Sequence, residues 1–399
     1  MTGEFESAMT FIHTADWQTG KPFAGIGDAH KRSLVQQERI EAVKRIGGVA
    51  QEHGAAFVLV AGDLFDSPSA DKATVSAACS AIGQIGVPVL AIPGNHDHGG
   101  PGCVWEQAFF QREREALAPN LRVLLEAAPV ELDAAVILPC PLLRRAVMAD
   151  PTDWLRTPEA FAGLSPDKPR IVLAHGSTQT FSGQWADDEE GASAGNLLDL
   201  SRLPAAEIDY IALGDWHGSK QVDAKAWYAG TPELDRFPKG GEHDPGNILV
   251  VEARRGAVPQ VARVATSRLR WSELAFDFAG DASLDTLQER LTGLLGARAN
   301  EDLLRLSLTG SLGIEAANRL EERLESLGAR LLRMKLANGT LIAPTEAELQ
   351  ALTARSGDPL IASVARQLVE RAAGDSEEAQ VARIALRELH AACTREART

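Results

Sequence analysis

The sequence of 399 residues contains little cysteine and no long apolar run. Its four cysteines lie far apart and form no CxxC pair: Cys79, Cys103, Cys140 and Cys393. This spacing argues against a disulfide scaffold and a thiolate zinc site, and it favours a cytoplasmic location. The longest apolar runs, such as residues 55–61, are far shorter than the roughly 18 residues of a membrane span, so we expect no membrane contact. The N-terminus shows no secretory pattern, and we expect residues 1–8 to be an added leader before Met9.

Positive charge is also scarce. The chain has 40 Lys and Arg against 55 Asp and Glu, which gives a formal net charge of −15. This acidic balance argues against a protein that wraps nucleic acid by bulk charge alone. The hydrophobic content of 45% and the charged content of 24% are ordinary for a globular protein. The length predicts two or three domains.

Short apolar segments alternate with helical patterns through the first two thirds of the chain. The apolar residues have helical spacing at 33–53 and 71–83. Apolar runs predict strands at 11–14, 55–61, 87–92, 122–125, 136–138, 171–174, 210–213 and 247–252. Such strand–helix–strand repeats imply a parallel sheet with helices on its faces. The stretch 176–196 is rich in Gly, Ser, Asp and Glu and predicts a long loop, whose acidic run 187–190 we expect to face solvent.

A change in composition near Arg268 marks a second part of the chain. Strands at 273–278, 303–308 and 331–336, with helices at 283–295 and 313–327, predict a compact β-α-β-α-β module. Residues 343–395 are mostly helical in pattern, with breaks at 357–359 and 374–375 and with Thr345 and Ser376 as N-caps. We therefore predict three parts, at 9–266, 267–340 and 341–399.

Polar residues follow five of the predicted strands, at the point where each strand ends. The five clusters are Asp16-Trp17-Gln18, Gly62-Asp63-Leu64-Phe65-Asp66, Gly94-Asn95-His96-Asp97, His175-Gly176 and Gly214-Asp215-Trp216-His217. The carboxyl ends of parallel strands meet at one edge of a sheet, so we expect these side chains to lie together. Oxygen and imidazole donors in such numbers suit two ions of Mn²⁺, Fe²⁺ or Zn²⁺. Two ions about 3.5–4 Å apart are a common device for phosphoester cleavage.

With these motifs the sequence resembles the calcineurin-like metallophosphoesterases. Within them it resembles most the D subunit of the bacterial SbcCD nuclease and its archaeal and eukaryotic counterparts in double-strand-break repair. The resemblance is carried by HTADWQ (13–18), GDLFD (62–66), GNHD (94–97), HG (175–176), GDWH (214–217) and YAGTPE (228–233), in the family's order. It implies an α/β fold: a metallophosphoesterase β-sandwich flanked by helices at 9–266, a small α+β capping domain at 267–340 and C-terminal helices at 341–399.

The resemblance also implies seven metal ligands and two catalytic residues. Asp63 would bridge two divalent ions. The other ligands divide into a first set, Asp16, Gln18 and His217, and a second set, Asn95, His175 and Asp215. His96 would meet the phosphate and protonate the leaving oxygen, and Asp97 would orient His96.

Two positions depart from the family's usual pattern. Gln18 stands where an imidazole is usual, and its amide oxygen is a weaker donor. Asp215 also replaces an imidazole, so the ligand set carries three carboxylates. This harder, oxygen-rich set favours Mn²⁺ over Zn²⁺, and Fe²⁺, Zn²⁺ and Mg²⁺ stay open as alternatives.

The function that the resemblance implies is that of a Mn²⁺-dependent DNA phosphodiesterase in DNA end processing and repair, an exonuclease with single-strand endonuclease activity. Its working form would be a homodimer joined to an SbcC-like ATPase with a long coiled coil. The helices at 71–83 and 104–117 are candidates for the dimer contact. Those at 345–395 either dock the ATPase or simply pack on the capping module. Two alternatives stay open: a metallophosphoesterase acting on small phosphodiesters or phosphomonoesters, which the net charge favours, and a weakly active nuclease scaffold.

Some residues near the motifs have simpler interpretations. Asp66 is of a residue type that often caps a turn. His13 is expected to be a packed or supporting residue, and His98 a loop histidine. Trp17 and Trp216 either pack in the core or line the cleft, where an aromatic ring could stack on a base.

Overall fold

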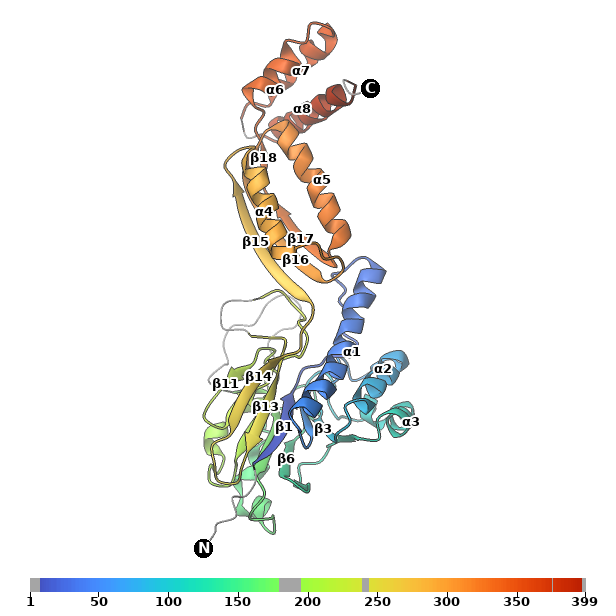
Figure 1. The fold of residues 1–399 in the computed structure, drawn as a ribbon, viewed down its shortest axis with the longest axis vertical. Coiled ribbons are helices and arrows are strands. Elements are labelled where there is room, and N and C mark those ends of the chain that lie inside the picture. Colours follow the sequence, from blue (N-terminus) through green and yellow to red (C-terminus); the bar gives the residue numbers. More distant parts are fainter. Residues whose placement is uncertain (1–7, 179–194, 239–243, 375, 397–399) are drawn as a thin grey trace. The chain divides into compact units, whose positions relative to one another are not determined.

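The computed structural model describes residues 8–178, 195–238, 244–374 and 376–396. The chain divides into two compact units, Met1–Leu269 and Arg270–Thr399 (Figure 1). Most of the loop predicted at 176–196, with its acidic run 187–190, lies outside the described residues, as do residues 1–7 of the expected leader. In the described ranges, no helix is both long enough and apolar enough to cross a membrane.

Two six-stranded sheets form the first unit. The first sheet contains, in spatial order, Gln260–Ala265 (β14), Asn247–Ala253 (β13), Met9–Thr14 (β1), Val58–Ala61 (β2), Val89–Ile92 (β3) and Leu121–Val123 (β4). The second contains Lys220–Gln221 (β11), Ala226–Tyr228 (β12), Tyr210–Gly214 (β10), Arg170–His175 (β7), Val136–Cys140 (β6) and Val130–Glu131 (β5). A separate pair joins Ser177–Thr178 (β8) to Leu197–Leu198 (β9). The fold is therefore a mixed α/β sandwich, as the resemblance implies.

The sheet topology corrects the expectation of a single parallel sheet. In the first sheet β1, β2, β3 and β4 are parallel neighbours, but β13 pairs antiparallel with both β1 and β14. In the second sheet β6, β7, β10 and β12 are parallel, and β5 and β11 add antiparallel edges. The strand–helix repeat identified the individual strands, whereas their division between two sheets depends on long-range pairing.

Alternate side chains of the central strands enter different cores. Leu59 of β2 and Ile171 of β7 belong to the core between the two sheets. Val58 and Val60 of β2 face the other way and pack under the helices. This period of two is that of a strand buried on both faces, which explains the continuous apolar runs in the sequence.

Three helices cover the outer face of the first sheet: Ala29–Glu52 (α1), Lys72–Gly83 (α2) and Ala108–Leu117 (α3) (Figure 1). The carboxylates of Asp28 and Asp71 cap α1 and α2 by accepting backbone N–H hydrogen bonds, each at 3.0 Å. The helix predicted at 104–117 is instead a 3₁₀ turn, Val104–Glu106, followed by α3, because the backbone is extended at Gln107.

The second unit is the predicted β-α-β-α-β module with further helices. Its parallel strands are Arg270–Phe278 (β15), Asp302–Leu312 (β16) and Arg333–Asn338 (β17), and Leu341–Ile342 (β18) pairs with the end of β16. The crossover helices Ser283–Leu295 (α4) and Ile314–Arg330 (α5) pack on one face, where leucines form most of the core (Figure 1). The other face is polar, since Arg305 pairs with Glu273 and the hydroxyl of Thr309 donates to Asp277 at 2.7 Å.

Three helices end the described chain: Glu346–Thr353 (α6), Pro359–Arg371 (α7) and Glu377–Glu396 (α8). The two predicted N-caps are confirmed. The hydroxyl of Thr345 accepts the N–H of Glu348 at 3.2 Å, and that of Ser376 accepts the N–H of Ala379 at the same distance. The side chain of Glu348 completes a capping box at the start of α6.

Glu348 also caps a second helix. Its carboxylate accepts the backbone N–H groups of Ile314 at 3.1 Å and Glu315 at 2.8 Å, at the start of α5. One carboxylate thus binds otherwise unpaired donors of two helices. Burial raises the pKa of Glu348, but these backbone hydrogen bonds outweigh burial and lower the pKa below its ordinary value.

Replacing Glu348 by Gln should destabilise the start of α5 at neutral pH. The folded-state pKa is lowered, so the ionised carboxylate contributes stability above its ordinary pKa, and this contribution is lost as the pH falls through the lowered value. We expect a loss of about 1–2 kcal/mol at pH 7. Hydrogen exchange at the amides of Ile314 and Glu315 should speed up accordingly, and the difference from wild type should vanish in acid.

The matched control is Glu346→Gln, which removes the same charge from an exposed position in α6. It should leave the exchange of the α5 amides unchanged. Equal acceleration in both variants would show that the effect is one of net charge rather than of capping.

Candidate metal centre

Four of the predicted ligands have a left-handed backbone conformation. Their φ angles are 53° at Asp16, 41° at Gln18, 56° at Asp63 and 98° at Asp215. Residues other than glycine rarely adopt such angles, which cost of order 1–3 kcal/mol each. All four lie in the turns that follow β1, β2 and β10. Strain concentrated in this way is typical of a functional site.

Two glycines allow these turns to approach one another. A Cβ atom on Gly94 would lie 2.1 Å from Oδ1 of Asp63, and one on Gly214 would lie 1.9 Å from the carbonyl oxygen of Ala61. Both distances are far below van der Waals contact, so no other residue fits without movement. The ends of strands from both sheets are thereby brought to one edge of the sandwich.

Asp16, Asp63 and His175 form a compact group of potential ligands, since one ligand atom of each lies within 4.8 Å of the others. All three side chains are buried. Among the described residues, neither carboxylate forms an ion pair with a lysine or an arginine. Buried carboxylates need protons or a cation to offset their charge, so this donor set fits a divalent ion. The group combines members of both expected ligand sets, because Asp16 belongs to the first set and His175 to the second.

His175 is held from both ring nitrogens. Nδ1 donates to the carbonyl oxygen of Ala61 at 2.8 Å, and Nε2 lies 3.0 Å from Oδ1 of Asn95. Nε2 also lies 3.6 Å from Asp63 and 3.8 Å from Asp215. Burial lowers the pKa of His175, but the neighbouring carboxylates outweigh burial and raise it to about 9. Without a metal ion, a proton on Nε2 therefore offsets part of the local negative charge.

The imidazole of His217, a predicted ligand, is in the neutral form that metal binding requires. Its Nδ1 lies 3.0 Å from Oδ2 of Asp235, a buried carboxylate. Burial lowers the pKa of His217 to about 3, although Asp235 opposes this shift. Nδ1 also lies 3.1 Å from Arg236, but it cannot both donate and accept, and we assign its proton to the bond with the carboxylate. Nε2 then carries a free lone pair, as in the carboxylate–histidine arrangement of many metal sites.

The two atypical positions, Gln18 and Asp215, have partners outside their motifs. Oε1 of Gln18 accepts a hydrogen bond from Nζ of Lys21 at 2.7 Å. The carboxylate of Asp215 accepts one from the hydroxyl of Ser177, also at 2.7 Å. The backbone N–H of Asp215 donates to Oδ1 of Asp16 at 3.1 Å, which links the turns after β1 and β10.

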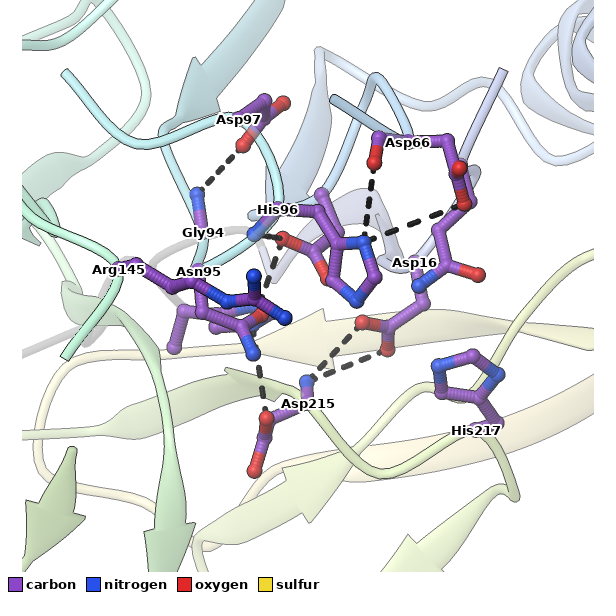
Figure 2. Close-up of polar contacts among 12 residues, drawn as sticks. Asp16, Asp66, Gly94, Asn95, His96, Asp97, Arg145, Asp215 and His217 are labelled. Atoms are coloured by element: carbon purple, nitrogen blue, oxygen red, sulfur yellow. Dashed lines mark hydrogen bonds and ion pairs between the residues drawn. The ribbon is translucent and has the colours of Figure 1, made fainter. Parts of the chain in front are cut away.

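His96 lies beside the metal-ligand group (Figure 2). Its Nε2 is 4.0 Å from Oδ2 of Asp63, and its backbone N–H donates to Oδ1 of Asp63 at 2.9 Å. Nδ1 lies 3.0 Å from the backbone carbonyl oxygen of Asp66 and can only donate to it. This contact leaves Nε2 as the nitrogen directed toward the ligands.

The hydrogen bonds of Asp97 go to the backbone rather than to the imidazole of His96. Its carboxylate accepts the backbone N–H groups of Gly94 at 2.7 Å and Phe65 at 3.0 Å, and Figure 2 shows it beside Gly94. Burial, reinforced by the charge of Asp63, raises the pKa of Asp97 to about 7. Asp97 therefore holds two ligand-bearing turns together. Nδ1 of His96 instead contacts Asp66, with the backbone carbonyl oxygen at 3.0 Å and the carboxylate at 3.9 Å.

Arg39 of α1 supports the turn after β1 from behind. The buried guanidinium donates to the carbonyl oxygens of Trp17 at 2.8 Å from Nε and of Asp16 at 3.1 Å. It also donates to the carbonyl oxygen of Glu233 and the hydroxyl of Thr231, each at 3.1 Å. The planar fork of arginine suits this set of acceptors, which a lysine could not bind together. Arg39 thereby fixes the backbone that carries Asp16 and Gln18.

Several of these contacts have no signal in the motifs. Asp66 contacts His96 through its carbonyl oxygen, which every residue type has, and its carboxylate also lies 3.9 Å from Nδ1 of His96. Lys21, Arg39 and Asp235 lie outside the strand-end clusters. Asp235 follows the YAGTPE motif by two residues, and this proximity was the one available clue. His13 is packed in the core, where Nδ1 lies 2.9 Å from the hydroxyl of Tyr210.

The two tryptophans next to the ligands lie in packed surroundings. Trp17 is buried, and its Nε1 donates to the hydroxyl of Thr14 at 2.9 Å. Trp216 is partly buried and packs against the outer core of the second sheet. Trp17 therefore packs in the core rather than lining the cleft.

Buried carboxylates and imidazoles at the edge of an α/β sandwich form a candidate site for divalent metal ions. Residues 9–219, more than half of the chain, match the family model described as calcineurin-like phosphoesterase. The chain belongs to the calcineurin-like phosphoesterase family. Among solved structures it is similar to TT1561 of Thermus thermophilus, with 13% identity, a TM-score of 0.38 and coverage of 65% of this chain and 100% of that one. A second solved structure has 11% identity and a TM-score of 0.39 at the same coverage.

Metal binding should release protons. Burial raises the pKa of Asp16 to about 8, with a further increase from Asp63, and His175 has a pKa of about 9. An incoming ion must displace these protons, so we expect apparent Mn²⁺ affinity to increase from about pH 6 to about pH 9. Calorimetry near neutral pH, in two buffers with different ionisation enthalpies, counts the protons released.

The variant Asp16→Asn removes one of the titrating groups and should release fewer protons for each ion bound. Mn²⁺ binding by the wild type without proton release would contradict this account of the metal-free centre.

Proposed function

We propose that the protein is a Mn²⁺-dependent phosphodiesterase that cleaves DNA, as an exonuclease with single-strand endonuclease activity. The observation that carries the proposal is the position of His96 beside the group formed by Asp16, Asp63 and His175. It combines a site for divalent cations with an imidazole whose Nε2 is directed toward that site. When bound, divalent ions activate water and stabilise the charge that develops on phosphoryl oxygens.

The chain's own residues would supply the proton. With Nδ1 donating to the carbonyl oxygen of Asp66, a protonated His96 can give the proton on Nε2 to the leaving oxygen. The second ring nitrogen stays bound throughout, so the imidazole keeps its orientation. Figure 2 shows the side chain of Arg145 extending toward Asn95, where an exposed guanidinium suits a phosphate group.

A DNA substrate is favoured by the motif resemblance and by the second unit, for which a minimal phosphatase has no need. The net charge of −15 favours small substrates instead. Ligand carboxylates account for part of that charge, and divalent ions would offset it locally. The isolated chain should accordingly bind DNA weakly and gain most of its affinity for the phosphate backbone from a dimer or a partner.

Replacing His96 by Ala should abolish most of the DNA cleavage without removing the metal. We expect a decrease of about 10²–10⁴-fold, the usual contribution of a positioned acid. The assay is Mn²⁺-dependent cleavage of end-labelled DNA hairpins, with product lengths read and bound Mn²⁺ measured in parallel. His98→Ala is the matched control, because it removes a neighbouring imidazole of the same loop, and it should retain activity.

The same preparations tested on a small chromogenic phosphodiester separate the two substrate classes. Activity on the small diester alone would favour a small-substrate phosphoesterase. Unchanged DNA cleavage by His96→Ala, or no activity of the wild type with any metal, would support a scaffold role instead.

The C-terminal helices have one side that packs on the rest of the second unit and another side that is apolar and exposed. Their inner side forms a small core with α5, which includes Leu352, Leu386 and Ile314. Their outer side leaves large apolar side chains exposed, by 73% at Leu360, 60% at Val381 and 51% at Ile384. We propose that this outer side, residues Leu360, Val364, Val381 and Ile384, docks an SbcC-like coiled-coil ATPase. The homodimer through α2 and α3 is proposed from the resemblance alone.

Placing charge on the outer side should remove the ATPase without unfolding the helices. Val381→Asp combined with Ile384→Asp should abolish co-purification with the ATPase, because two carboxylates would enter an apolar interface. Val258→Asp is the control, since Val258 is an exposed apolar residue of the first unit. Removal of the whole helical segment is a poorer test, because it would also uncover Ile314. If the double variant still co-purified with the ATPase, the docking surface would have to lie elsewhere on the protein.

A further inference from the structure

We propose that Lys21 makes the metal centre unequal, so that one divalent ion binds tightly and a second binds more weakly. The tight ion would be held by Asp63 with the second ligand set, Asn95, His175 and Asp215. The weak ion would be held by the first set, Asp16, Gln18 and His217. The inference deepens the proposed function, on which it rests, by assigning the difference between the two positions to a residue outside the ligand motifs.

The first observation concerns Gln18. Its amide oxygen is the one atom of this side chain that can bind a cation, and that oxygen already accepts a hydrogen bond from Nζ of Lys21 at 2.7 Å. An ion that shared this oxygen would stand beside an ammonium group. Like charges repel strongly where solvent screening is weak, and the side chain of Lys21 is only 21% exposed.

The second observation concerns the support of His217. Asp235, which binds Nδ1 of His217, also forms ion pairs with Lys21 at 3.1 Å and with Arg236 at 2.9 Å. Two cations thus contact the one buried carboxylate that supports His217. Lys21 matters more than Arg236 because it is less exposed and because it also binds a predicted ligand.

The position held by the second ligand set has no such contact with a lysine in the described part of the chain. Neither Asp63 nor Asp215 forms an ion pair with a lysine or an arginine in the described part of the chain, and Asp63 is buried. No lysine or arginine therefore competes with an ion for these carboxylates. Arg145, which Figure 2 shows near Asn95, is exposed, so solvent and salt screen its charge. An ammonium group on one side of a small centre repels the nearer ion more strongly than the farther one, which separates the two affinities.

The unmodified protein provides the first test. Metal-free wild type is titrated with Mn²⁺ and followed by calorimetry and by electron paramagnetic resonance. We expect a second ion at least tenfold weaker than the first. The spectrum should be that of an isolated ion at one equivalent and that of an exchange-coupled pair only in excess Mn²⁺. Equal affinities, or a coupled pair already at one equivalent, would overturn the proposal.

Variants of Lys21 provide the second test. Lys21→Met should tighten the second ion about tenfold or more and leave the first unchanged. Lys21→Arg keeps the charge and should retain the wild-type difference. Lys44→Met removes an equal charge from a surface pair with Glu41 on α1 and should change neither affinity.

The outcomes distinguish this proposal from the proposed function. A folded Lys21→Met protein with the wild-type difference in affinity would overturn the role of Lys21 and leave the phosphodiesterase proposal intact. If Lys21→Met does not fold, the wild-type titration still decides whether the two positions are unequal. No binding of Mn²⁺ at all would overturn both proposals.

Discussion

The ligand-bearing turns crowd together at one edge of the sandwich, and this crowding governs the rest of the first unit. The turns approach so closely that Gly94 and Gly214 cannot carry a side chain, and the backbone at Asp16 and Asp63 is left-handed. Each such residue destabilises the folded state by an amount comparable with a good hydrogen bond. The well-packed cores on both sides of the first sheet offset this strain, and Arg39 holds the turn after β1 in place.

The sequence predicted the buried strands better than the exposed ones. β2 and β3 are continuous apolar runs because both of their faces are covered, so pattern alone reveals them. No apolar run predicts β14, because its residues are partly or fully exposed. Its conformation depends on its pairing with β13. The division into two sheets was also beyond a local pattern, since it depends on which strands pair across long stretches of chain.

The motifs predict some of the site residues but not the contacts that hold them in place. Motifs specify residue types, so they pointed to Asp63 and His175 at the ends of strands, and the structure brings these together with Asp16. The motifs do not predict that His96 contacts a backbone carbonyl oxygen, because every residue type carries one. The contact of Lys21 with Gln18 depends on a side-chain direction within one tight turn, which residue spacing does not determine.

The double cap made by Glu348 has a mechanical consequence. The carboxylate joins the first turn of α6 to the first turn of α5, and the small core around Ile314 lies next to it. A load on α6 would therefore reach α5 through these contacts, as well as the sheet of the second unit through β18, which pairs with β16. Hydrogen bonds to a charged acceptor resist such a load better than neutral ones. Movement of α6 would in this way be transmitted to the start of α5.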